Sequence, residues 1–144
     1  YGGATGPSEL ASIDYFTIAS TGNATDFGDI GSGAQNNAQG GSSSTRGVHG
    51  GGYNGSDQKE NTISYITIQT TGDSTDFGDL TVARADQAGA SNGVRVGWFG
   101  GDGDQTTCDF VTIATTGNAT DFGDTNIAGR NFRATAEFHG GINA

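Results

Sequence analysis

Apolar and polar residues alternate along short stretches of this chain, which is the pattern of strands with one buried face. In residues 63–70, the apolar Ile63, Tyr65 and Ile68 are interleaved with Ser and Thr. Such mixtures of β-branched and aromatic residues favour half-buried strands. No window keeps the 3.6-residue apolar period of a helix, so the sequence predicts an all-β fold.

This strand pattern belongs to a sixteen-residue phrase that occurs three times, at 14–29, 64–79 and 109–124. In each copy the strand is followed by Thr-Gly-Asx, where Asx is Asn or Asp, and then by Asp-Phe-Gly-Asp. A Gly-Asx turn between two extended runs predicts a β-hairpin. Because the copies start 50 and then 45 residues apart, the sequence predicts a repeat architecture.

A second repeated element is an alternating strand that enters a pair of glycines, at 45–52, 94–101 and 133–141. Paired glycines allow a backbone or a bulky side chain to approach closely, so we expect this strand to be the most crowded one. The segment 80–85 predicts a strand end or turn that leads to the next unit.

Adding a connecting strand gives about four short strands in each unit of some 48 residues, the size of a propeller blade. The expected order is the glycine-pair strand, the strand that opens the phrase, the Asp-Phe-Gly-Asp strand and the connecting strand. We therefore expect a single repeat domain, 1–144, with blades at approximately 1–44, 45–92 and 93–132. Residues 133–144 then form an extra strand that completes a blade in the same or a neighbouring chain.

The order of glycine pair, polar loop, Tyr-containing strand, aromatic strand and Arg resembles the kelch repeat. The chain departs from kelch units in carrying Phe27, Phe77 and Phe122 where Trp is usual. The wording Thr-Gly-Asn-Ala-Thr-Asp-Phe-Gly-Asp also resembles the tandem kelch-like repeats in virion structural and tail-fibre proteins of tailed phages, especially marine ones. The resemblance implies a β-propeller of kelch-like four-stranded blades, located in a virion or outside the cell.

Three blades are too few for a propeller, which typically closes with four to eight. We therefore expect self-association, in which another chain or an exchanged strand completes the fold. Two copies with C2 symmetry would form a six-bladed ring, and a contact that does not close would form a filament. Either arrangement covers sheet edges that otherwise promote aggregation.

Composition narrows the range of partners. The apolar share is only 32%, but the 27 glycines fall at fixed places in the repeat, which favours a folded, turn-rich β protein over disorder. A net charge of -10 repels phosphate, so we expect no nucleic-acid partner.

Because no apolar run reaches the roughly 18 residues of a membrane span, we expect no membrane insertion. The single cysteine, Cys108, is predicted to be a small buried apolar residue.

The sequence contains no recognisable catalytic set, and we expect no enzyme activity. His49 and His139 stand just before glycine pairs, where the second of the three glycine-pair strands has Phe99. Because this position accepts another aromatic residue, a structural role is favoured for the histidines. No Gly-x-Ser-x-Gly nucleophile elbow occurs, and the glycine-rich segments lack the Lys and helix of a phosphate loop. A glycan-cleaving enzyme that uses paired carboxylates remains the third reading.

Paired aspartates flank the aromatic residue of every phrase. They act either as turn caps or as oxygen ligands for Ca²⁺, the one cofactor that the sequence leaves open. Their repetition in each unit favours a structural role over an active site. The Ca²⁺ candidates are Asp26, Asp29, Asp76, Asp79, Asp121 and Asp124.

The leading functional prediction is a non-enzymatic structural or adhesion module of a virion or extracellular fibre. The alternative is a multivalent carbohydrate-binding propeller that recognises host surface glycans, because repeated shallow sites multiply weak binding. Its candidate contacts are Tyr53, Asn54, Trp98 and Phe132. The alternating strand around Trp98 favours a place in the core over a ligand contact.

Overall fold

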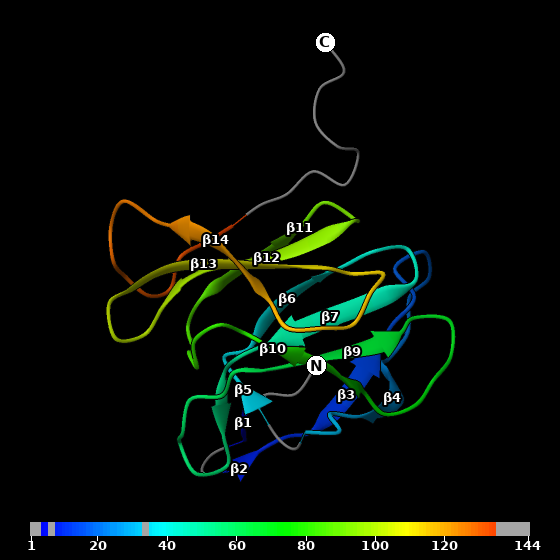
Figure 1. The fold of residues 1–144 in the computed structure, drawn as a ribbon. Coiled ribbons are helices and arrows are strands. Elements are labelled where there is room, and N and C mark those ends of the chain that lie inside the picture. Colours follow the sequence, from blue (N-terminus) through cyan, green and yellow to red (C-terminus); the bar gives the residue numbers. More distant parts are fainter. Residues whose placement is uncertain (1–3, 6–7, 33–34, 135–144) are drawn as a thin grey trace.

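The structure, a computed structural model, describes residues 4–5, 8–32 and 35–134. In these ranges the regular structure consists entirely of β-strands, arranged in two four-stranded antiparallel sheets and three two-stranded ones (Figure 1). The all-β prediction is confirmed.

The middle and third phrases each lie in a four-stranded sheet whose strands follow one another in space in chain order. The predicted hairpins are confirmed in both, since the two strands of each phrase pair in antiparallel fashion. The middle sheet contains β6 (Gln39–Ser42), β7 (Arg46–Gly50), β9 (Thr62–Thr67) and β10 (Thr75–Asp79). The third sheet contains β11 (Ala88–Ser91), β12 (Arg95–Gly101), β13 (Gln105–Thr112) and β14 (Thr120–Asp124).

The connecting strand of each four-stranded sheet precedes the glycine-pair strand with which it pairs. β6 and β11 therefore begin their sheets at residues 39 and 88, upstream of the expected unit starts at 45 and 93. Of the extra strand expected at 133–144, only residues 133 and 134 are described, and they lie outside any strand.

The first phrase forms a smaller sheet, a hairpin of β3 (Ser12–Tyr15) and β4 (Thr25–Asp29). Two short pairs accompany it. β1 (Ala4–Thr5) pairs with β2 (Ser8–Glu9), and β5 (Gln35–Asn36) pairs with β8 (Tyr53–Asn54).

All three phrases have the same local structure. Each hairpin contains a register shift beside the Phe of Asp-Phe-Gly-Asp, as a β-bulge produces. The bulged Phe meets an aromatic ring of the partner strand edge to face, a favourable geometry for two aromatic rings. The ring centroids are 6.0 Å apart for Tyr15 and Phe27, 5.8 Å for Tyr65 and Phe77, and 5.9 Å for Phe110 and Phe122.

The core lies between successive units. Its larger part joins the middle and third sheets, which also contact each other through β6, β11 and β12. This cluster contains Val48, Ile63, Phe77, Leu80, Val96, Trp98, Val111 and Ile113. A smaller cluster of Ile13, Phe27 and Ile30, with Ala11 and Ile66 against it, joins the first unit to the middle one. Burial of such side chains contributes about 1.5–3 kcal/mol each.

The two glycine pairs that the structure describes are crowded, as the sequence predicted. A Cβ on Gly51 would lie 2.6 Å from the Gln87 side chain and from a backbone oxygen. At the corresponding Gly100, a Cβ would collide with the ring of Phe132. Both described glycine pairs thus receive a side chain from the segment that follows the next phrase along the chain.

Strand register corrects the expected place of His49. His49 pairs with Ser64 as Trp98 pairs with Asp109, so Trp98 rather than Phe99 is its counterpart. His49 is buried and its Nε2 donates to Gln35 Oε1 at 3.1 Å. Burial lowers the pKa of His49 to about 4, so the ring is neutral near pH 7. His139 lies outside the described residues.

Candidate functional site

Two of the predicted glycan contacts pack within the protein. Trp98 is fully enclosed, and its Nε1 donates to the backbone oxygen of Gln39 at 2.6 Å. Its ring therefore presents no surface to a ligand, as its alternating strand had favoured. Phe132 is half-buried against Gly100 and Gly129.

Tyr53 belongs to a small polar cluster between the middle and third units. Its hydroxyl donates to Asp102 Oδ2 at 2.7 Å. The same carboxylate forms ion pairs with Lys59 at 3.3 Å and with Arg130 at 3.4 Å. The hydrogen bond to Asp102 raises the pKa of Tyr53 to about 12 and lowers the pKa of Asp102. The cluster thus ties together loops from two units.

Asn54 stabilises its own loop. Its Oδ1 accepts hydrogen bonds from the backbone N–H groups of Ser56 at 2.9 Å and Gln58 at 3.0 Å, and its Nδ2 donates to Glu60. The four residues predicted to bind glycan are therefore not brought together into one open site.

The paired aspartates lie on the surface of the Asp-Phe-Gly-Asp strands. Asp121 Oδ1 accepts from the Gly123 N–H at 3.0 Å, and Asp124 Oδ1 accepts from Thr106 Oγ1 at 2.8 Å. Within the described part of the chain, no group of three or more His, Cys, Asp or Glu side chains is placed to hold a metal ion. Ca²⁺ binding stays a prediction, and the third unit's contacts are those of a strand and turn cap.

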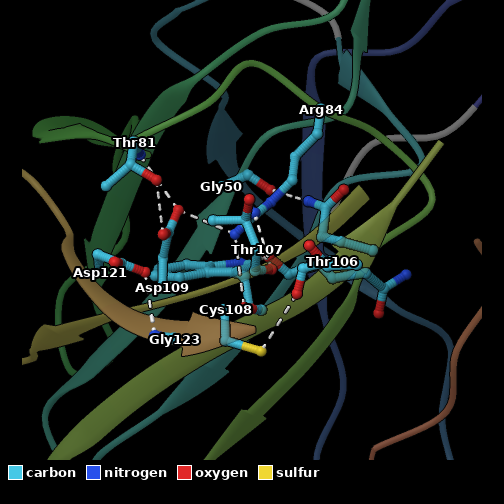
Figure 2. A network of polar contacts seen from close by, with 12 residues as sticks. Gly50, Thr81, Arg84, Thr106, Thr107, Cys108, Asp109, Asp121 and Gly123 are labelled. Atoms are coloured by element: carbon cyan, nitrogen blue, oxygen red, sulfur yellow. Dashed lines mark hydrogen bonds and ion pairs between the residues drawn. The ribbon is translucent and has the colours of Figure 1, made fainter. Parts of the chain in front are cut away.

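Sequence reasoning missed the most buried ionic group, the pair of Arg84 and Asp109 (Figure 2). Both side chains are fully buried, and Arg84 Nη2 lies 2.9 Å from Asp109 Oδ2. Thr81 donates to the same carboxylate from its hydroxyl at 2.6 Å and from its N–H at 3.1 Å. Arg84 Nη1 donates to the Thr107 oxygen at 3.0 Å.

This network anchors the irregular connection 80–87 to the third sheet. Burial lowers the pKa of Arg84, and the neighbouring charge of Asp109 opposes that shift. A buried pair of this kind needs nearly complete hydrogen bonding to offset its desolvation. Cys108, beside Asp109, is buried as predicted, and burial raises the pKa of its thiol.

Successive units meet in a repeated contact that we call the junction, in which the Thr-Gly-Asx turn of one phrase lies on the Asp-Phe-Gly-Asp strand of the preceding phrase. In the first junction, Gly72 N–H donates to the Phe27 oxygen at 2.7 Å and Ser74 N–H to the Asp29 oxygen at 2.8 Å. In the second, Gly117 and Ala119 donate to the oxygens of Phe77 and Asp79, both at 2.7 Å.

The Asx side chain and a glycine complete each junction. Asp73 Oδ1 accepts from Asp29 N–H at 2.9 Å, and Asn118 Oδ1 accepts from Asp79 N–H at 3.1 Å. A Cβ on Gly78 would lie 2.5 Å from the Gly117 backbone. The turn and strand therefore fit only because glycine occupies this position of the strand, with the same crowding at Gly28.

Each outer unit has one face that no other described unit covers. On the third unit, the Phe122 side chain is 68% exposed, whereas its counterpart Phe77 is 2% exposed. On the first unit, Ile18 is 91% exposed, whereas its counterparts Ile68 and Ile113 are 42% and 2% exposed. The uncovered face of the third unit contains an apolar cleft of roughly 360 Å³ lined by Phe99, Phe110, Phe122 and Arg95, among others.

Comparison with known proteins does not assign this chain to a family. No model of a known protein family matches the chain, and a search of curated proteins returns no match. The described residues contain no helix of the length and apolarity that a membrane span requires.

Proposed function

We propose that this protein is a non-enzymatic structural or adhesion module of a virion or extracellular fibre, and that its units are propeller-like blades which assemble with those of other copies. The junction is the observation that carries the proposal. The repeated residues of the phrase, namely the Thr-Gly-Asx turn and the Phe-Gly-Asp strand, are the ones that join unit to unit. Repetition therefore serves assembly.

The buried ionisable groups support the same reading. The Asp109 carboxylate is held by Thr81 and Arg84 inside the fold, and His49 is neutral and donates to Gln35. A catalytic acid or base needs access to substrate. These side chains stabilise connections between units instead.

Negative-stain electron microscopy of the purified protein, with sedimentation velocity on the same sample, tests the proposal. We expect ordered particles, either rings that combine the six blades of two copies or filaments. A monomer that shows no ordered association at any concentration or ionic strength would contradict the assembly role.

The aromatic cleft on the third unit favours one second candidate, the carbohydrate-binding module. Exposed Phe122 beside Phe110, with Arg95 stacked 4.6 Å from the Phe110 ring centroid, offers an apolar platform with a polar edge. A glycan array tests this candidate. Binding that is lost in Phe122→Ala and kept in Val94→Ala would support it, and silence across the array would count against it.

A further inference from the structure

The two uncovered faces carry the two complementary halves of a junction. The first unit has a free-standing turn, Gly22, Asn23 and Ala24, all exposed. The third unit has the receiving strand, β14, with Phe122, Gly123 and Asp124 at the positions that accept a turn in the other phrases.

The hydrogen-bonding groups on these faces match the internal junctions one for one. The N–H groups of Gly22 and Ala24 correspond to the donors of the two existing turns, and the backbone oxygens of Phe122 and Asp124 correspond to the acceptors. Within residues 8–32 and 35–134, none of these four groups bonds to another unit. Asn23 is the same residue type as Asn118, whose side chain caps the strand at the second junction.

The receiving strand also has room for a turn. A Cβ on Gly28 or Gly78 would collide with the turn that lies there, whereas a Cβ on Gly123 would meet no atom of the described residues within 4 Å. β14 therefore has the same bulged shape as the covered strands β4 and β10. The place that a turn occupies on those two strands is open on β14 in the described part of the chain.

An arginine of the third unit, Arg95, is placed as the arginine that bonds across the second junction is. Arg46 lies 4.5 Å from the Tyr65 ring centroid and donates through Nη1 to the Ile113 oxygen of the following unit at 2.9 Å. Arg95 stacks in the same manner on Phe110. The counterpart of Ile113 in the first phrase is Ile18, which is 91% exposed.

We propose that β14 of one copy receives the turn 21–25 of a second copy, so that the protein associates head to tail through a third junction of the internal kind. This inference rests on the proposed assembly function and names the partner and the contact. Asn23 would cap Asp124, Arg95 would bind the Ile18 oxygen, and Phe16 and Ile18 would cover Phe122. The occupant is a second copy because Gly22, Asn23 and Ala24 are the same residue types as Gly117, Asn118 and Ala119, which form the turn of the second junction. Such a heterologous contact closes into a ring or extends into a filament.

Two charge substitutions test the contact, one on each face. Ile18→Asp and Phe122→Asp alter side chains that are 91% and 68% exposed, so folding of the single chain is expected to survive both. The matched control is Val94→Asp, which adds the same charge at a side chain that is 62% exposed. Its counterpart Thr45 stays exposed beside a covered junction.

Sedimentation velocity from about 1 to about 300 µM, a range that resolves weak to moderate interfaces, gives the readout. We expect the average mass of the wild type and of Val94→Asp to rise with concentration. Both face variants should stay monomeric, with the apparent dissociation constant raised at least about 30-fold, as for a central interface residue. Circular dichroism and the melting temperature of dilute samples verify folding.

Mixing the two face variants identifies the polarity of the contact. Ile18→Asp retains an intact β14 face, and Phe122→Asp retains an intact turn, so the mixture should form a dimer with one copy of each. If the wild type associates while the variants leave association unchanged, or the mixture forms no dimer, this contact is wrong and the assembly function stands. If the wild type is a monomer throughout, both are wrong.

Discussion

The middle and third phrases have nearly the same sequence but lie in different surroundings. Phe77 and Phe122 both lie in a β-bulge and both meet an aromatic ring edge to face. Yet Phe77 is 2% exposed and Phe122 is 68% exposed. The phrase therefore determines the hairpin, and the neighbouring unit determines burial.

The two connections between successive units also differ in their polar chemistry. Between the middle and third units, the buried Arg84 and Asp109 pair fastens the connection, whereas His49 and Gln35 make the buried side-chain hydrogen bond near the connection between the first and middle units. In repeat proteins, stability is approximately the sum of unit and interface terms. Covered and uncovered copies of one position should then respond very differently to the same substitution.

The largest difference is expected between Asp109 and its counterpart Asp14. Asp109→Ala leaves Arg84 buried without its partner, which should lower the free energy of unfolding by about 3–5 kcal/mol. Asp14→Ala removes an exposed carboxylate and should change it by no more than about 0.5 kcal/mol. Urea denaturation of dilute samples measures both losses of stability. Equal losses would contradict the buried ionic role of Asp109.

Phe77 and Phe122 allow the same comparison of a covered and an uncovered position for an apolar side chain. Phe77→Ala should cost about 3 kcal/mol, because it opens a cavity in the main core. Phe122→Ala should cost about 1 kcal/mol or less, chiefly the ring contact with Phe110. The measurement is again urea denaturation at low concentration, and a loss at Phe122 as large as that at Phe77 would mean that its face is covered within one chain.

Acidification should lower the free energy of unfolding through His49, by less than the two core substitutions do. The folded pKa of His49 is about 4 against 6.5 for the unfolded residue, so only the unfolded chain binds this proton between those values. Stability is complete above the unfolded pKa and falls as the pH drops, by about 2 kcal/mol between about pH 8 and about pH 5.

Comparing the wild type with His49→Phe isolates this term, because the variant lacks the titrating ring. Its unfolding free energy should depend less on pH over the same interval. Two parallel pH profiles would show that another group accounts for the loss.

Much of the fold was predictable from the sequence because its signals are local. The hairpins follow from alternation and Gly-Asx turns, and the crowding at Gly51 and Gly100 follows from the paired glycines. The sheet boundaries were not predictable, because β6 has the sequence Gln-Gly-Gly-Ser, which carries no apolar alternation. The register that aligns His49 with Trp98 depends on strand pairing across hairpins.

The candidate site was less predictable for a physical reason. Arg84 and Asp109 are 25 positions apart, and only folding of the connection onto the third sheet brings them together. The junctions use residues that are the same or closely similar in every copy, so sequence alone does not distinguish a covered phrase from an uncovered one. The predicted glycan residues were chosen as aromatic or polar loop positions, but Trp98 is enclosed in the core and Phe132 is half-buried against Gly100 and Gly129.

Amide hydrogen exchange at Gly22, Ala24 and Asp124 tests head-to-tail docking most directly. In the internal junctions, the corresponding N–H groups are hydrogen-bonded between units, and such bonds slow exchange. We predict that these three amides exchange rapidly in dilute protein and in Ile18→Asp, and at least about tenfold more slowly in concentrated wild type. Equally rapid exchange of all three at every concentration would contradict the account.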